Sequence, residues 1–177
     1  GKEQAKEAAQ RLQDQKIDII LASPLERTTQ TAEIISKAIG VEIIFDERLR
    51  EIEVGNFEGR SWDEYLKLYP HSLNPNRTDE NGIEGIEDVQ DRLNSFLDEI
   101  NEKYQGKNIL IVSHGGSLDV LRGMLSGMSK EEILISSPMT KNGEIIQAYS
   151  KFFDLHKPFI DDVKFKCECG GEMKRET

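Results

Sequence analysis

The chain has 177 residues, 37% of them hydrophobic and 32% charged, which is typical of one folded domain with an appendage. Its formal net charge of -10 argues against a nucleic-acid surface, because phosphate backbones require a basic footprint. No apolar run approaches the ~20 residues that span a bilayer, and no signal-peptide pattern opens the chain. We therefore expect a cytoplasmic protein that contacts no membrane and binds no nucleic acid directly through this segment.

The first predicted elements alternate between helix and strand. Apolar residues with helical spacing predict a helix over 5–12, and the apolar run 17–22 predicts a buried strand that ends in a turn. A second helix is predicted over 32–39 and ends at Gly40, since glycine is favoured just past a helix. The run 41–45 predicts a second strand.

The later elements continue this alternation after an interruption. Residues 46–85 are polar and weakly periodic, and a long irregular stretch of this kind usually has a function. A long helix is predicted over 86–100, a buried strand over 109–112, a helix over 118–125 and a last strand over 143–149. The alternation predicts an α/β fold, a three-layer α/β/α sandwich with a mainly parallel sheet.

Polar residues that suit an anion follow two of these strands directly, over 23–27 and over 113–116. Ser113-His114-Gly115-Gly116 lies between a predicted strand and a predicted helix. Ligands of parallel sheets bind beyond the carboxyl ends of the strands, where glycines permit close approach and helix N-termini attract anions. The same turn is equally typical of a capping serine beside a histidine that binds nothing.

Arg27 and a group of glutamates are further candidates. Arg27 falls early in a helix, where the dipole disfavours a cation unless an anion lies between them; the alternative is a surface salt bridge. Glu51, Glu53 and Glu58 lie in the irregular stretch. Any of these carboxyl groups could protonate a leaving alcohol over a phosphate site, or be solvated surface in an acidic chain.

Together these segments resemble the histidine phosphatase superfamily, the phosphoglycerate-mutase-like proteins, over residues 1–149. Gly1, Gln4 and Ala5 fit the opening helix of that family. The motifs that carry the resemblance are Ser23-x-Leu25-x-Arg27-x-x-x-Thr31-Ala32 (second arginine), Leu49-x-Glu51-x-x-x-Gly55-x-Phe57-Glu58-Gly59 (acid loop) and Ser113-His114-Gly115-Gly116 (second histidine).

The resemblance implies a phosphoglycerate-mutase-like fold and phosphoryl transfer through a phosphohistidine, with a small phosphorylated substrate and no metal or organic cofactor. It implies that Arg27 and His114 bind the phosphoryl group and take part in catalysis, and that the N–H of Gly115 assists binding. It assigns the proton donor to Glu51 rather than Glu53. The substrate and the choice between hydrolase and mutase stay open, although the short insertion favours a hydrolase.

Two departures from the family pattern stand out. The nucleophile of the family belongs to an Arg-His-Gly motif that ends the first central strand, and this sequence contains no such motif; His71 and His156 lie in the polar insertion and the tail. Because the chain opens on Gly1 with a helical pattern, we interpret it as truncated, lacking the first central strand, and expect it to be inactive by itself. The alternative is an evolved pseudoenzyme, which would still need the central strand to fold well. Ile83-Glu84-Gly85 replaces a Gly-Glu-Ser of many relatives, which puts substrate contacts from that loop in doubt.

The sequence changes character after residue 149. We expect residues 1–149 to form the phosphatase-like domain and residues 150–177 to form a tail. Residues 154–175 resemble the part of isoleucyl-tRNA synthetases that follows the editing domain, whereas the simpler interpretation is a flexible tail. The resemblance predicts that the rest of a synthetase is joined to this chain. An alternative function follows, namely a synthetase fragment whose phosphatase-like insert has a structural or regulatory role.

Two short motifs near the C-terminus have ordinary interpretations. Cys167 and Cys169 are too close in sequence to bridge each other easily, and they are at most half of a tetrahedral zinc site. They indicate a reduced compartment or half a metal site. Gly127-Met128-Ser129-Lys130 faintly resembles a synthetase loop, but we interpret it as an ordinary helix end.

Overall fold

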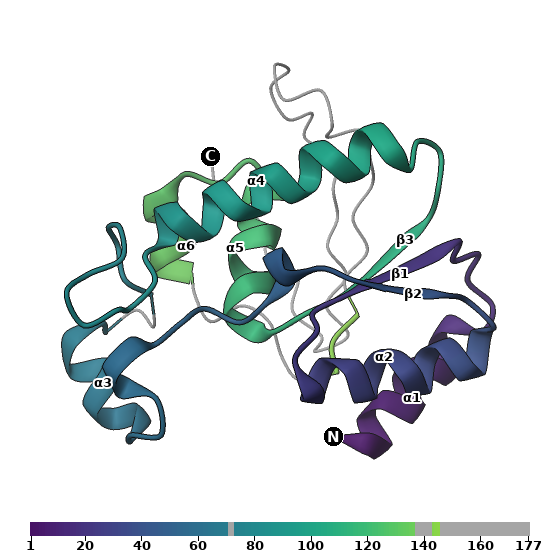
Figure 1. Ribbon diagram of the computed structural model, residues 1–177, viewed down its shortest axis with the longest axis horizontal. Coiled ribbons are helices and arrows are strands. Elements are labelled where there is room, and N and C mark those ends of the chain that lie inside the picture. Colours follow the sequence, from purple (N-terminus) through teal and green to yellow (C-terminus); the bar gives the residue numbers. More distant parts are fainter. Residues whose placement is uncertain (71–72, 137–142, 146–177) are drawn as a thin grey trace, which may run out of the picture.

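The computed structural model describes residues 1–70, 73–136 and 143–145. They form an α/β fold in which parallel strands lie between helices, as the sequence predicts (Figure 1). The strands are β1 (Ile19–Ala22), β2 (Ile43–Phe45) and β3 (Ile109–Val112). The helices are α1 (Lys2–Leu12), α2 (Glu26–Ile39), α3 (Trp62–Leu68), α4 (Ile86–Lys103), α5 (Gly115–Leu125) and α6 (Lys130–Ser136), with 3₁₀ turns η1 (Glu47–Leu49) and η2 (Gly55–Phe57).

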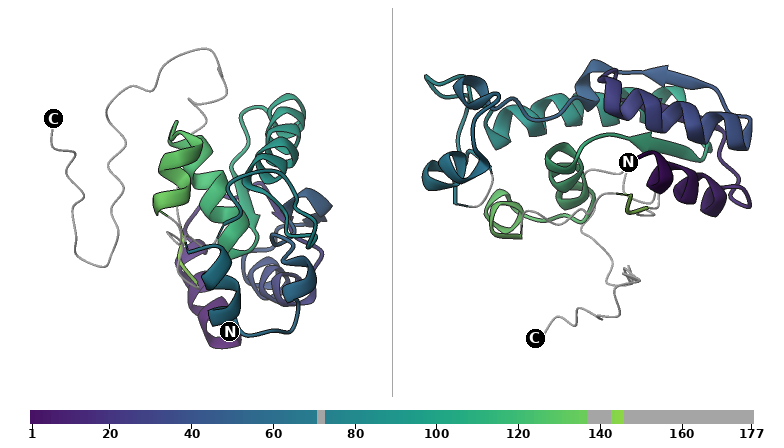
Figure 2. Two further views of the ribbon diagram at one scale, coloured as in Figure 1. Left: turned by 90° about the vertical axis from the view of Figure 1, so that its left-hand side faces the viewer. Right: turned by 90° about the horizontal axis from the view of Figure 1, so that it is seen from below.

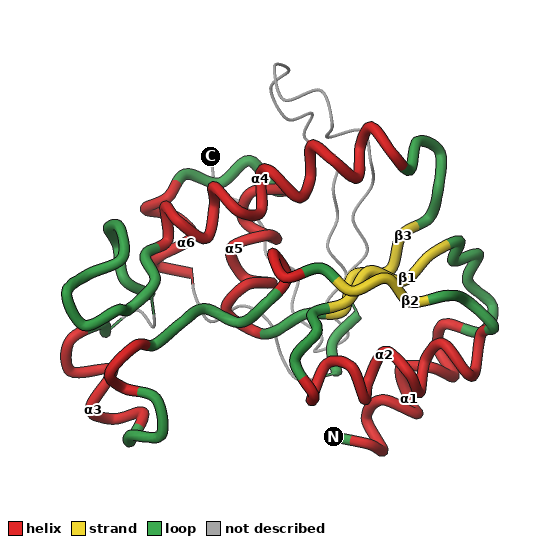
Figure 3. The backbone as a smooth tube through the Cα atoms, viewed as in Figure 1, coloured by secondary structure: helices red, strands yellow, loops and turns green. Residues whose placement is uncertain are grey.

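The described strands form one parallel sheet in the order β2-β1-β3. Ala22, the last residue of β1, pairs with Phe45 on one side and with Val112 on the other. The strands therefore end at the same level, and the loops that follow them lie side by side (Figure 3). This register brings Ser23, Asp46 and Ser113 to one edge of the sheet.

Helices cover both faces of the sheet, because alternate strand residues point to opposite sides. Ile20 and Ala22 pack in one apolar cluster with residues of α1 and α2, whereas Leu21 packs in a second cluster with residues of α4 and α5. The views in Figures 1 and 2 show the same layers, with α1 and α2 on one side of the strands and α4 on the other. The three layers predicted from the sequence are present.

Two short helices, α3 and α6, were not predicted. Each is preceded by a serine that is followed three residues later by glutamate, the pattern of a capping box. The Oγ of Ser129 accepts from the N–H of Glu132 at 3.2 Å, and the Glu132 carboxylate accepts from the N–H of Ser129 at 2.8 Å. Ser61 caps α3 through the N–H of Asp63 at 3.2 Å. The stretch 46–85 is thus less irregular than expected, and a new helix follows the helix end at Gly127 directly.

Several predictions fall on residues that the structure does not describe. Of the last predicted strand, 143–149, only 143–145 are described, and these are not in a strand. His71, His156, both cysteines and the tail lie outside the described residues. Within the described part of the chain, no helix is long and apolar enough to cross a membrane. No cluster of three or more acidic, histidine or cysteine side chains suits a metal ion among those same residues.

Candidate functional site

Arg27 and His114 meet at the carboxyl edge of the sheet, each at the start of a helix. Arg27 is in the first turn of α2, which follows β1, and His114 is the extended residue before α5, which follows β3. Because β1 and β3 are paired neighbours, the two helix starts lie together. Nε of Arg27 donates to Nδ1 of His114 at 2.9 Å. The structure thus brings together two residues that are 87 positions apart in the sequence.

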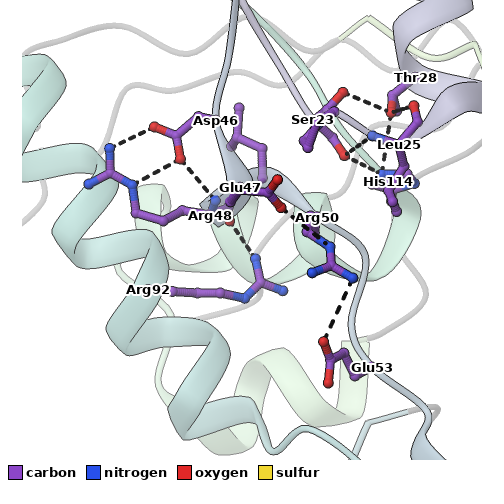
Figure 4. A network of polar contacts seen from close by, with 12 residues as sticks. Ser23, Leu25, Thr28, Asp46, Glu47, Arg48, Arg50, Glu53, Arg92 and His114 are labelled. Carbon is purple, nitrogen blue, oxygen red and sulfur yellow. Dashed lines mark hydrogen bonds and ion pairs between the residues drawn. The ribbon is translucent and has the colours of Figure 1, made fainter.

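The imidazole of His114 is buried and has protein partners on both nitrogens. Its Nε2 lies 2.8 Å from Oγ of Ser23 and 3.5 Å from Oγ1 of Thr28 (Figure 4). Since Nδ1 accepts from a guanidinium, the ring is neutral and its proton is on Nε2. Burial, together with the charges of Arg27 and Arg92, lowers the pKa of His114 to about 4. The ring is therefore uncharged at neutral pH in this arrangement.

Glu51 faces the same place from the loop that follows β2. One of its carboxylate oxygens, Oε2, lies 3.8 Å from Nη2 of Arg27, and its side chain is one-third exposed. The other oxygen accepts from the N–H of Ile52 at 3.1 Å and, more weakly, from the N–H of Ser117 at 3.4 Å. Burial raises the pKa of Glu51 despite these donors and the nearby arginines. A carboxyl group with a raised pKa is suited to give a proton to a leaving group.

The other glutamates of this loop are placed differently. Glu53 is 65% exposed and lies 3.8 Å from the guanidinium of Arg50, on the far side of the loop from His114 (Figure 4). Glu58 is exposed beyond the η2 turn. Of these three candidates, Glu51 is the one that the structure places beside Arg27.

The two glycines after His114 have different surroundings. A Cβ at Gly115 would meet no atom within 4 Å, so the space beside the first turn of α5 is open. A Cβ at Gly116 would lie 2.9 Å from Cδ1 of Ile52 and 3.0 Å from Oε1 of Glu51. Gly115 thus leaves room at a helix N-terminus that attracts anions, and Gly116 lets the glutamate loop approach α5.

Ser113 is not the capping serine that the alternative interpretation assumed. The residue before α5 is His114, and no side chain caps this helix. Oγ of Ser113 instead donates to the carbonyl of Leu49 at 2.7 Å and ties the loop after β2 to the end of β3. The predicted serine cap was wrong, because the residue before the helix is His114 rather than Ser113.

Glu84, in the segment that departs from the family pattern, has a structural partner. Its carboxylate accepts two hydrogen bonds from Arg92, at 2.8 and 3.2 Å, and one from the N–H of Glu53 at 3.2 Å. The glycine that replaces the serine is required for packing, because a Cβ at Gly85 would lie 1.9 Å from the carbonyl oxygen of Asn76. This segment therefore supports the loop of Glu51.

Sequence reasoning missed the residues that surround the predicted ones. Ser23 and Thr28 contact His114; the sequence marked the strand end at 23–27 but gave neither residue a role. Arg92 and Ser117 carried no such signal, since both lie inside helices with ordinary amphipathic patterns. Together the site offers a guanidinium, an imidazole and an open helix N-terminus for an anion, with a protonatable carboxyl group alongside.

Comparison with known proteins agrees with this chemistry. Residues 1–147 match the histidine phosphatase superfamily (branch 1). The chain is 35% identical over 131 residues to the uncharacterized phosphatase PhoE of Bacillus subtilis (strain 168), a match that covers 74% of this chain and 65% of that protein. It is 35% identical over 147 residues to phosphoglycerate mutase-like protein 4 of Arabidopsis thaliana, covering 77% of this chain and 64% of that protein. The chain therefore spans less than two thirds of the length of these relatives.

Solved structures show the same fold. Bacillus stearothermophilus YhfR matches with a TM-score of 0.71 and 28% identity, over 82% of this chain and 74% of that one. The α-ribazole phosphatase from Shigella flexneri matches with a TM-score of 0.61 and 28% identity, over 75% and 68%. Sequence, fold and site lead to one conclusion: the chain belongs to the histidine phosphatase superfamily.

Proposed function

We propose that this chain forms the phosphate-binding and proton-donating side of a phosphomonoesterase that works through a phosphohistidine. The observation that carries the proposal is the position of Arg27, whose guanidinium joins the imidazole of His114 to the carboxylate of Glu51. A cation that holds a neutral histidine on one side and a carboxyl group of raised pKa on the other is suited to a phosphate ester.

Binding of a phosphoryl group requires one rearrangement. The Arg27 side chain is 64% exposed, so its guanidinium can rotate toward phosphoryl oxygens. This rotation breaks its hydrogen bond to Nδ1 of His114. A dianion beside the imidazole favours its protonated form, so Nδ1 takes up a proton and donates to a phosphoryl oxygen. The open helix start at Gly115 provides further N–H donors.

The transfer then takes two steps. A histidine nitrogen attacks phosphorus, the P–O ester bond breaks, and Glu51 gives its proton to the leaving oxygen. Water next attacks phosphorus, the P–N bond breaks, and Glu51 takes the proton from this water, so that the carboxyl group is restored. Because no Arg-His-Gly motif occurs in this sequence, we propose that the attacking histidine belongs to a segment outside these 177 residues, and that the chain alone is inactive.

The names of relatives support a small phosphate monoester as substrate. Phosphoserine phosphatase 1 of Hydrogenobacter thermophilus is 34% identical over 119 residues, covering 64% of this chain and 56% of that protein. The likeness to phosphoglycerate mutase-like protein 4 keeps a mutase as the alternative reaction. The two reactions differ in whether water or a second alcohol accepts the phosphoryl group.

The proposal is tested on the polypeptide as the cell makes it, including any residues outside these 177. We expect turnover of phosphate monoesters and an acid-labile, alkali-stable phosphoprotein intermediate that can be trapped by rapid mixing. Arg27→Met and His114→Ala should each reduce turnover at least tenfold, because each removes a donor to the transferred group. Turnover that neither substitution slows would overturn the site assignment.

We also propose that the division at residue 149 separates a phosphatase-like domain from a tail that belongs to an isoleucyl-tRNA synthetase. Two consecutive motifs within residues 154–175 support this proposal. Sequencing the gene across both ends of the chain tests it. A stop codon directly after Thr177 would contradict it.

A further inference from the structure

Three consecutive carbonyl groups just before Glu51 are each held by a side chain from another segment. Nη1 of Arg92 donates to the first carbonyl at 2.5 Å, Oγ of Ser113 to the second at 2.7 Å, and Oγ of Ser117 to the third at 2.5 Å. The acceptors are the carbonyl oxygens of residues 48–50. The donors come from α4, the end of β3 and α5, so three distant segments grip one short stretch of backbone.

These three hydrogen bonds determine the position of Glu51. The third carbonyl belongs to the peptide unit whose N–H is that of Glu51, so holding the three units fixes where its Cα lies and how its side chain leaves the backbone. The N–H of Ser117 also reaches the Glu51 carboxylate at 3.4 Å. The position of the proton donor is therefore set by hydrogen bonds to backbone, since the loop itself is not part of the sheet.

Arg92 is the centre of this arrangement. Its side chain is 18% exposed, and the side chain of Glu84 is 15% exposed. Nε and Nη2 of Arg92 donate to the two carboxylate oxygens of Glu84. Nη2 also donates to Oγ of Ser117 at 3.1 Å, so Arg92 directs the serine hydroxyl hydrogen toward the carbonyl of Arg50. Glu84 in turn accepts from the N–H of Glu53 at 3.2 Å. The Arg92–Glu84 pair thus holds the loop on both sides of Glu51 (Figure 4 shows Arg92 beneath residues 46–50).

We propose that Arg92, held by Glu84, is the positioning residue for the proton donor: it keeps the loop closed against α5 so that the Glu51 carboxyl group faces Arg27. This inference rests on the proposed function in the role it gives Glu51. Arg92 positions Glu51 through the backbone that precedes it; its charge, in addition, lowers the pKa of both Glu51 and His114.

The sharpest test uses two substrates that differ in their need for an acid. An alkyl phosphate has a poor leaving group and requires protonation, whereas p-nitrophenyl phosphate has a good one and requires little. We expect Arg92→Met to reduce kcat for the alkyl phosphate by about 10²-fold, within the range of general acid catalysis, and kcat for p-nitrophenyl phosphate only a few-fold. A purely structural role would lower both equally, and that outcome would overturn the proposal.

Two further variants sharpen the result. In a Glu51→Gln background, Arg92→Met should lower kcat for the alkyl phosphate no more than the few-fold expected with p-nitrophenyl phosphate, because the group that Arg92 positions is gone; a further loss of about 10²-fold would contradict the proposal. Arg77→Met is the matched control. Arg77 binds three carboxylates on α4, those of Glu87, Asp88 and Asp91, but it is 56% exposed and none of these ion pairs involves the Glu51 loop. It should leave both rates unchanged.

Hydrogen exchange separates failure of this inference from failure of the proposed function. We expect Arg92→Met to raise the exchange rate of the Glu53 amide about tenfold or more while the amides of β3 keep their protection. An unchanged Glu53 amide would overturn the positioning role even in an active enzyme. A protein with no turnover of any phosphate ester, but with this local change, would refute the proposed function and leave the grip on the loop established. If Arg92→Met unfolds, Ser117→Ala, which removes one donor, is expected to show the same local exchange change.

Discussion

Arg27 and His114 reach the site from the ends of two neighbouring strands, whereas Glu51 reaches it from a loop. On the first side, the pairing of Ala22 with Val112 sets the separation of the helix starts through backbone hydrogen bonds. On the second side, Arg92 and serines of two other segments hold the loop through side chains. The sheet therefore places Arg27 beside His114, whereas the position of Glu51 depends on a few polar side chains, each of which a single substitution removes.

Burial has opposite consequences on the two sides, because it disfavours the charged form of each group. It lowers the pKa of His114 to about 4 and keeps the imidazole neutral. It raises the pKa of Glu51 and favours the protonated carboxyl group. Burial thus leaves a neutral imidazole at His114 and shifts the titration of the Glu51 carboxyl group to higher pH.

The largest expected effect separates two neighbouring glutamates. Glu51→Gln should reduce kcat for an alkyl phosphate by about 10²- to 10⁴-fold, the usual contribution of a general acid. Glu53→Gln is the matched control and should change kcat less than threefold, because Glu53 is 65% exposed and faces Arg50. Steady-state kinetics on the cellular polypeptide measures both. An equal loss in the two variants would place the proton donor elsewhere.

The next effect is a loss of stability at low pH that belongs to His114. The pKa of this group falls from 6.5 to about 4 on folding, so its contribution is present above pH 6.5 and is lost as the pH falls through 4. His114 thus contributes about 3 kcal/mol to the free energy of unfolding at neutral pH, of which about 2 kcal/mol is lost by pH 5. Denaturant unfolding at pH 7 and pH 5 measures it. His114→Gln should show a smaller drop over that interval, and an identical drop would mean that the histidine is not buried neutral.

Gly115 and Gly116 allow a direct test of how closely the Glu51 loop packs against α5. Gly116→Ala places a methyl group 2.9 Å from Cδ1 of Ile52 and 3.0 Å from Oε1 of Glu51; these side-chain ends must shift, and we expect a cost of about 1 kcal/mol, at the low end for overpacking. Gly115→Ala meets open space and should change the free energy of unfolding by less than about 1 kcal/mol, the helix preference of alanine opposing any loss. Chemical denaturation of both variants checks the comparison. Equal stability would show that the loop lies farther from α5.

The smallest expected effect concerns the serine that joins the sheet to the loop. Ser113→Ala removes the donor to the Leu49 carbonyl and should cost about 1 kcal/mol of unfolding free energy, the usual net value of one hydrogen bond. The site formed by Arg27 and His114 should persist, because the sheet positions it. Chemical shifts of the His114 ring report on this. A large shift there would show that the two sides are not independently built.

The sequence by itself determined the elements whose pattern is local. Apolar runs with β-strand character and helical stripes predicted β3 and the long helix α4 closely, and the polar residues at two strand ends indicated a place where the structure brings Arg27 and His114 together. The family motif distinguished Glu51 from Glu53, which composition alone left equivalent. The short helices α3 and α6 escaped prediction because seven residues are too few for a clear stripe, although their capping serines were visible.

Only the tertiary structure decided what holds the acid loop. Arg92 and the Arg48 carbonyl are 44 positions apart, and Ser117 and the Arg50 carbonyl are 67 apart. No sequence pattern links such pairs, because a side chain on an amphipathic helix finds its backbone acceptor only after the helices pack on the sheet. Strand ends are predictable since the backbone ladder that aligns them is the same in every parallel sheet. The hydrogen bonds that position Glu51 depend on which particular side chains the packed helices bring to one short loop.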